Sequence, residues 1–156
     1  NEVNDATKKT AENNPLTWNY DVTIDEMTDS ENRFATIESI NYIEQDFPYS
    51  GKTHAEIAIR YMKKYGTDVL ISITQGQIIG DNFRGDNYVN VRFGDSEPKK
   101  YYFNRAADLS SETIFITKSK DFIERCKSAK DIKIEIPLYQ GGRPVFSFHV
   151  DETLNW

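Results

Sequence analysis

Cysteine is almost missing from this sequence, since Cys126 is the single one among 156 residues. One cysteine excludes a disulfide bond within the chain and any zinc site built from cysteines alone. Long apolar runs are missing too, and a membrane-spanning helix would need roughly 20 such residues in a row. Neither a disulfide scaffold nor a transmembrane helix is therefore expected.

A surplus of basic residues is also missing. The chain carries 19 Lys and Arg against 25 Asp and Glu, which gives a formal net charge of −6. Nucleic acids are bound by clustered cations that neutralise phosphates, and anionic membrane surfaces attract the same clusters. Nucleic acid is therefore not expected as a partner, and a membrane is expected only through an N-terminal anchor outside this chain.

Apolar residues are numerous enough for one core, because 38% of the chain is hydrophobic and it has nine Phe and nine Tyr. A chain of this length can bury roughly 68–70% of its unfolded surface. Residues 1–15 are almost free of apolar side chains and are interpreted as a flexible polar linker, since burial cannot offset their ordering entropy. A single domain is expected over residues 16–156.

Apolar and polar side chains alternate along most of this domain, and Trp18, Tyr20, Val22 and Ile24 begin the pattern. Period two is typical of strands with one buried face, and the spacing of the turn residues favours a sandwich or barrel. We expect an antiparallel β-sandwich of about nine strands, because each apolar face needs a second layer to cover it. The predicted strands are residues 18–24, 33–43, 55–61, 69–73, 88–93, 100–105, 113–117, 132–138 and 145–150.

One segment has helical spacing instead. Phe122, Ile123, Cys126 and Ala129 would share one face of a helix. Ser119 is the expected N-cap, because its hydroxyl can accept a hydrogen bond from a free N–H of the first turn. The fold class is therefore all-β with one short helix, and Cys126 is expected to be a buried structural thiol.

Few residues in the sequence favour catalysis. Ser147, His149 and Asp151 would share one face of a strand, which suggests a hydrolase triad as a third, weaker hypothesis. Side chains two residues apart on a strand are separated by about 6.6 Å along its axis, so a surface histidine is the favoured interpretation. No catalytic, cofactor-binding or metal-ligating residue is assigned, and the chain is predicted not to be an enzyme.

Two acidic loops could supply oxygen ligands to calcium, although neither has the spacing of an EF-hand. The favoured interpretation is turn chemistry, because Asp and Asn side chains satisfy nearby backbone groups. The residues concerned are Asp25, Glu26, Asp29, Glu31, Asp81, Asn82, Asp86 and Asn87.

Tyrosines are the candidate contact residues. Tyr101 and Tyr102 are adjacent on a predicted strand and must point to opposite faces, so at least one should be exposed. Exposed aromatic rings can anchor a protein partner or stack on a sugar. The residues assigned to ligand or partner contact are Tyr42, Tyr49, Tyr101 and Tyr102.

Several motifs resemble those of small exported bacterial proteins, and all follow Trp18 in the same order. They are Met27-Thr28-Asp29, residues 67–71 (TDVLI), residues 91–95 (VRFGD), residues 113–116 (TIFI), Phe122-Ile123, residues 138–142 (LYQGG) and Phe146-Ser147-Phe148. The order is similar to that of the invasion-associated locus B proteins and the type VI secretion-associated accessory lipoproteins. This resemblance implies a β-sandwich in the periplasm or on a lipid-anchored stalk, with no catalytic residues to transfer.

The leading hypothesis is an exported, lipid-anchored, non-enzymatic interaction domain of the cell envelope that binds another envelope protein. The alternative hypothesis is a carbohydrate-binding sandwich whose tyrosines stack on sugars. The sequence identifies neither the partner nor the oligomeric state.

Overall fold

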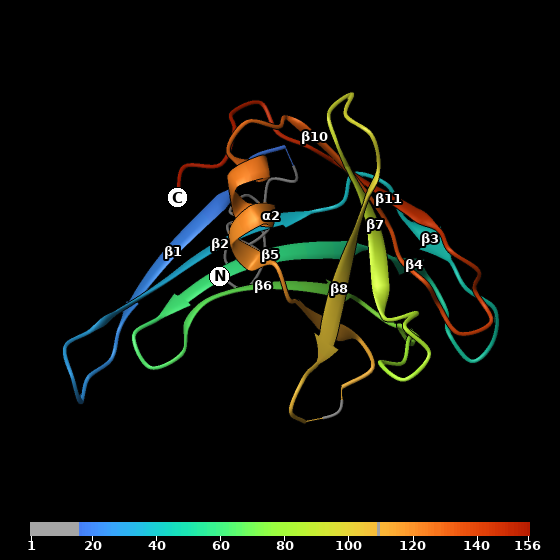
Figure 1. Ribbon diagram of the computed structural model, residues 1–156, viewed down its shortest axis with the longest axis horizontal. Coiled ribbons are helices and arrows are strands. Elements are labelled where there is room, and N and C mark those ends of the chain that lie inside the picture. The colour runs from blue at the N-terminus through green and yellow to red at the C-terminus, as the bar shows by residue number, and fades with distance from the viewer. Residues whose placement is uncertain (1–15, 109) are drawn as a thin grey trace, which may run out of the picture.

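The computed structural model describes residues 16–108 and 110–156, so the linker predicted over residues 1–15 lies outside the described residues. Strands dominate it, and one short helix follows the ninth strand (Figure 1). The elements are β1 Asn19–Ile24, β2 Glu31–Glu38, β3 Ile43–Glu44, β4 Lys52–Thr53, β5 Ala55–Met62, β6 Gly66–Ile73, β7 Tyr88–Phe93, β8 Lys99–Arg105, β9 Thr113–Ile116, α2 Ser119–Cys126, β10 Asp131–Glu135 and β11 Val145–His149.

Nine of these strands form one antiparallel sheet, in the order β1-β2-β5-β6-β9-β8-β7-β10-β11, and β3 pairs with β4 in a second, small sheet. β8 belongs to both halves of the large sheet. Its C-terminal end pairs with β9 from Phe103 to Arg105, and its N-terminal end pairs with β7 from Lys99 to Tyr102. The predicted all-β fold is confirmed, and its two layers are halves of one sheet.

The core lies between the inner faces of these halves. Alternation predicted it well, because Ile57, Ile59, Val69 and Ile71 are fully buried in the β5–β6 hairpin. Helix α2 contributes the expected apolar stripe, which includes Cys126. The expected N-cap is wrong, since Lys118 holds that position without a side-chain hydrogen bond and Ser119 is the first helical residue.

One edge of the large sheet is covered by the chain that follows β2. Ile40 N–H donates to the Ser147 carbonyl of β11, and the Asn41 side chain accepts from Ser147 N–H and donates to the Val145 carbonyl. These bonds explain why the strand predicted over residues 33–43 ends at Glu38. Ser39 still donates its N–H to the Ala55 carbonyl of β5, and from Ile40 onward the backbone bonds to β11.

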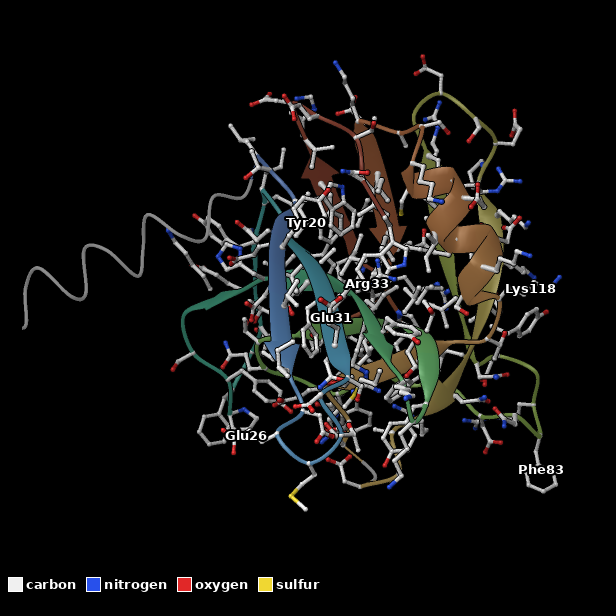
Figure 2. All side chains as sticks on the ribbon, turned by 90° about the vertical axis from the view of Figure 1, so that its left-hand side faces the viewer. Tyr20, Glu26, Glu31, Arg33, Phe83 and Lys118 are labelled. Carbon is white, nitrogen blue, oxygen red and sulfur yellow. The ribbon has the colours of Figure 1, made fainter. Side chains whose placement is uncertain are left out.

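The other edge is β1, and here the prediction of a half-buried strand is wrong after Trp18. Trp18 is buried, but Tyr20, Val22 and Ile24 are 50–55% exposed. Figure 2 shows β1 as the outermost strand of its sheet on the side that faces the viewer. The second layer covers the start of the β1–β2 hairpin and leaves the remainder open.

Candidate functional site

The structure places the four candidate tyrosines in different surroundings. Tyr102 on β8 and Tyr42 before β3 are 44% and 45% exposed, and Tyr49 in the β3–β4 loop is half-buried. Tyr101 is 1% exposed, so as a contact residue it is corrected to a core residue. The expectation that Tyr101 and Tyr102 face opposite sides is confirmed.

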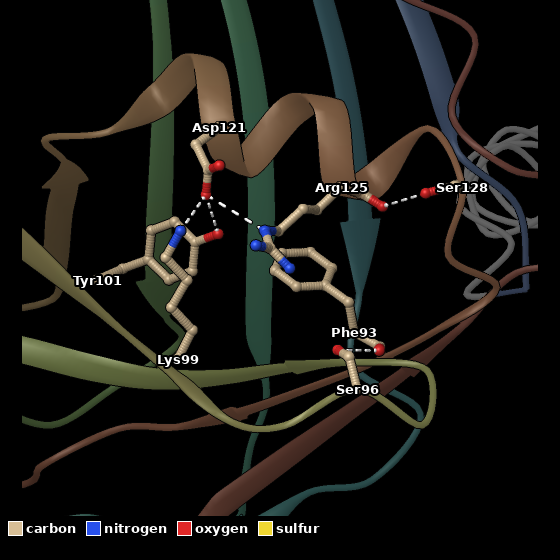
Figure 3. Close-up of polar contacts among 7 residues, drawn as sticks. All are labelled: Phe93, Ser96, Lys99, Tyr101, Asp121, Arg125 and Ser128. Carbon is tan, nitrogen blue, oxygen red and sulfur yellow. Dashed lines mark hydrogen bonds and ion pairs between the residues drawn. The ribbon is translucent and has the colours of Figure 1, made fainter.

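Tyr101 instead holds helix α2 on the sheet. Its hydroxyl donates to Asp121 Oδ2 at 2.6 Å, and the same oxygen accepts from Lys99 Nζ at 2.9 Å and Arg125 Nε at 3.3 Å (Figure 3). The hydrogen bond from Tyr101, followed by that from Lys99, lowers the pKa of Asp121 to about 2. Burial and the hydrogen bond to Asp121 raise the pKa of Tyr101. The cluster is structural, because Tyr101, Lys99 and Arg125 all donate to the Asp121 carboxylate.

Acid should therefore weaken the attachment of α2. The pKa of Asp121 is 3.8 in the absence of these partners and about 2 in the fold. Its contribution to stability is present above the higher value and is lost as the pH falls through the lower one. Wild type should lose stability more steeply than Asp121→Asn between about pH 4 and pH 2. Urea unfolding across that range measures the slopes, and parallel slopes would contradict the assignment.

An exposed group of side chains covers the outer face of β8, β7 and β10 around Tyr102. Tyr102 lies opposite Tyr88 in the strand register, with ring centroids 5.9 Å apart in an edge-to-face arrangement. Lys100 Nζ lies 4.4 Å and Arg143 Cζ 5.0 Å from the centroid of the Tyr88 ring. We name this group, together with the residues of the next rungs, the aromatic–basic face. Its members are Lys100, Tyr102, Tyr88, Asn90, Arg92, Lys133, Glu135 and Arg143.

The charge of the aromatic–basic face is opposite to that of the whole chain. Asp131, at the start of β10, lies on the same outer side but pairs with His149 and is not counted in the group. The acid within the group is Glu135, whose Oε1 accepts from Arg143 Nε at 2.8 Å and from Asn90 Nδ2 at 3.0 Å. These bonds lower the pKa of Glu135, so it stays ionised and keeps its ion pair with Arg143. Three cations remain. None of Lys100, Arg92 and Lys133 forms an ion pair with a described residue.

Tyr42 belongs to a different surface. Lys52 Nζ lies 4.4 Å from the centroid of the Tyr42 ring, and the His54 ring is 5.8 Å away in a tilted arrangement. His54 Nδ1 lies 3.5 Å from Glu38. Tyr42 and Tyr102 therefore do not form a joint site.

The proposed triad residues do not assemble as the hydrolase hypothesis requires. His149 Nδ1 lies 2.7 Å from Asp131 Oδ1, while its Nε2 is 3.6 Å from Asp151. Ser147 makes no hydrogen bond to His149 among the described contacts, and its backbone is bound to residues 40 and 41. His149 thus pairs mainly with the neighbouring strand, through an aspartate that sequence spacing did not reveal.

The acidic loops use their carboxylates to build turns. Asp25 Oδ1 accepts from the N–H of Met27, and Asp81 Oδ1 accepts from the N–H of Phe83. Asp86 Oδ1 accepts from the N–H of Asp81 at 2.6 Å. Within the part of the chain that the structure describes, His, Cys, Asp and Glu side chains form no group of three that could hold a metal ion. No helix there has the length and apolar character needed to cross a membrane.

Sequence reasoning found Tyr102 and missed the residues that surround it. Tyr88 and Arg143 were not assigned, because their proximity depends on the pairing of β7 with β8 and β10. The available signal was the alternation of Lys100 and Tyr102 along β8, which places both on one face.

Comparison with known proteins gives one structural similarity. Invasion-associated protein B from Bartonella henselae matches with a TM-score of 0.48 and 8% sequence identity, over 83% of this chain and 82% of that chain. No family model matches the sequence, and the comparison with curated proteins found no match. At this TM-score and identity the match carries no conclusion about the role of the chain. The compartment and role implied by the sequence motifs therefore stay predictions.

Proposed function

We propose that this chain is a non-catalytic interaction domain, exported to the cell envelope and lipid-anchored through a segment before residue 1, that binds an acidic protein partner. The observation that carries the proposal is the aromatic–basic face. An exposed tyrosine shares that face with three cations that have no ion-pair partner among the described residues, in a chain whose net charge is −6. Such a surface attracts an acidic partner at long range and offers an aromatic anchor at contact.

The alternative, a carbohydrate-binding module, is less well supported by the same geometry. Sugars stack on open aromatic faces, but Lys100 and Arg143 lie over the Tyr88 ring and Lys52 lies over the Tyr42 ring. Tyr49 and Tyr102 are the candidate tyrosines without a cation over their rings among the described contacts, and of these two Tyr102 is exposed whereas Tyr49 is half-buried. A glycan array in which binding depends on Tyr102 would favour this alternative over the protein partner.

Photo-cross-linking in the source cell tests the proposal. A photoreactive phenylalanine analogue at position 102 should cross-link an envelope protein through a segment rich in Asp and Glu. The same analogue at position 65 is the control, because Tyr65 is also exposed but lies in the β5–β6 turn. Equal products at both positions, a partner segment without acids, or a purely cytosolic pool of the protein would each overturn the proposal.

Removal of the Tyr102 ring should weaken binding to the partner. Tyr102→Ala is expected to reduce the affinity at least tenfold, about 1.4 kcal/mol, because exposed aromatics at the centre of interfaces carry much of the binding energy. Tyr65→Ala should leave it unchanged. Calorimetry with the purified partner measures both, and an unaltered affinity for Tyr102→Ala would contradict the assigned face.

A further inference from the structure

The open edge strand β1 is a second surface, independent of the aromatic–basic face. The pairing of β1 with β2 determines which backbone N–H and C=O groups of β1 point outward. Asp25 N–H donates to the Ser30 carbonyl, so this pair is hydrogen-bonded. Hydrogen-bonded residues alternate along an antiparallel strand, and the register continues through Thr23 with Asn32 and Asp21 with Phe34. The intervening residues therefore direct N–H and C=O groups away from β2. They are Tyr20, Val22 and Ile24.

The same three residues carry the exposed apolar side chains. Tyr20, Val22 and Ile24 are 50%, 55% and 53% exposed, and all lie on the face that continues the buried Ala35 of β2. Strands at sheet edges are usually protected by charge, by bulges or by a covering segment, because they can pair with other chains. The β11 edge has such a cover in Ile40 and Asn41. The C-terminal segment reaches this strand at the Tyr20 hydroxyl, which accepts from the Asn155 N–H. Among the described residues, no segment hydrogen-bonds to the outward backbone groups of residues 20–24.

The charge around this edge indicates what would cover it. Five exposed acids lie on the β1–β2 hairpin, and none forms an ion pair with a described residue. Figure 2 shows Glu31 near Arg33 on this hairpin, and Glu26 further away at the hairpin turn. Arg33 forms cation–π contacts instead of ion pairs, since its Cζ lies 5.2 Å from the centroid of the Tyr61 ring and 5.1 Å from that of the Trp156 ring. The five acids are Asp21, Asp25, Glu26, Asp29 and Glu31.

The geometry points to strand addition: β1 accepts an extended segment of a partner protein, with apolar side chains at every second position and Lys or Arg between them. Backbone groups of Tyr20, Val22 and Ile24 would hydrogen-bond to the added strand. Its apolar side chains would pack beside theirs, and its cations would lie on the other face near Asp21. A second copy of this chain fits less well, because β1 contains no cation to place beside Asp21.

Synthetic peptides test this inference on the intact protein. The probe is a peptide of alternating valine and lysine, and its controls are a valine–glutamate peptide and a valine–lysine peptide N-methylated at alternate residues. The valine–lysine peptide should bind at least tenfold more tightly than either control. Equal binding of the N-methylated peptide would overturn strand addition, and equal binding of the glutamate peptide would overturn the choice of a basic partner.

Val22→Pro is the matched protein variant. Its ring removes an N–H that points outward, so the β1–β2 ladder keeps its hydrogen bonds and the fold should persist, as for prolines on edge strands. Binding of the valine–lysine peptide should fall at least tenfold. Undiminished binding to a folded Val22→Pro protein would overturn the inference. Should this variant unfold, the N-methylated peptide tests the same hydrogen bonds on the wild type.

Hydrogen exchange gives the residue-level readout. The amides of Tyr20, Val22 and Ile24 should exchange quickly in the free protein and at least tenfold more slowly with the valine–lysine peptide. Those of Asp21 and Thr23 should already be protected by β2. Protection of all five residues alike, or a concentration-dependent dimer that protects β1 without peptide, would contradict the proposed occupant.

Discussion

Phe122→Ala is expected to lower the free energy of unfolding by about 3–5 kcal/mol, the cost of removing a large aromatic side chain from a core. Phe122 is fully buried on α2, and its ring centroid lies 5.3 Å from those of both Phe93 and Tyr101. The contacts are edge-to-face, the arrangement that aromatic pairs favour. Alanine would leave a cavity where α2 meets β7 and β8.

Urea unfolding measures this change, and Lys120→Ala is its matched control on the same helix. Lys120 is exposed and alanine is a strong helix former, so its free energy of unfolding should stay within about 0.5 kcal/mol of wild type. The corresponding drop in melting temperature for Phe122→Ala is about 6–20 °C. A loss below about 1 kcal/mol would show that α2 contributes little to the core.

The strands were predictable because side-chain alternation is a local property. The β5–β6 hairpin illustrates this: its apolar positions are spaced every second residue, and Gly66 adopts the positive φ of 76° that its turn requires. Neighbouring residues settle both features. The helix stripe at Phe122 and Cys126 was predictable for the same reason, with a period of 3.6 residues.

The exposure of β1 was not predictable, because alternation does not say what lies opposite a strand. Val22 has the same local pattern as Ile57, yet Val22 is 55% exposed and Ile57 is fully buried. The difference comes from position, since β5 pairs on both sides and β1 pairs only with β2. The prediction of the N-cap was also wrong, because Ser119 begins the helix that it was expected to precede.

The aromatic–basic face required knowledge of long-range pairing. Arg143 precedes β11, Tyr88 begins β7, and only the register of β7, β8 and β10 brings them together. Tyr101 was assigned to contact because adjacent tyrosines must face opposite ways, and the sequence does not say which faces out. Its hydrogen bond to Asp121, 20 residues later, answers that question only in the folded chain.

Gly80→Ala should destabilise the protein by about 3–5 kcal/mol, through backbone strain and overpacking together. Gly80 has a φ of +148°, which L side chains rarely adopt. A Cβ there would lie 2.8 Å from the Asn87 Cα and 2.8 Å from the Phe103 ring. Asn87 and Phe103 exchange hydrogen bonds and immediately flank Tyr88 and Tyr102. The strain would therefore reach the aromatic–basic face.

Gly94→Ala separates these two effects. Gly94 also has a positive φ, +55°, but a Cβ there meets no atom within 4 Å. The free energy of unfolding of Gly94→Ala should therefore fall by only about 1–2 kcal/mol, the cost of holding an L residue at a positive φ. Urea unfolding compares the two variants, and equal losses would show that Gly80 is not sterically confined. Because Gly80 packs against Asn87 and Phe103, which adjoin Tyr88 and Tyr102 in the chain, its alanine variant should also weaken partner binding under conditions where it remains folded. The Gly94 variant should bind like wild type.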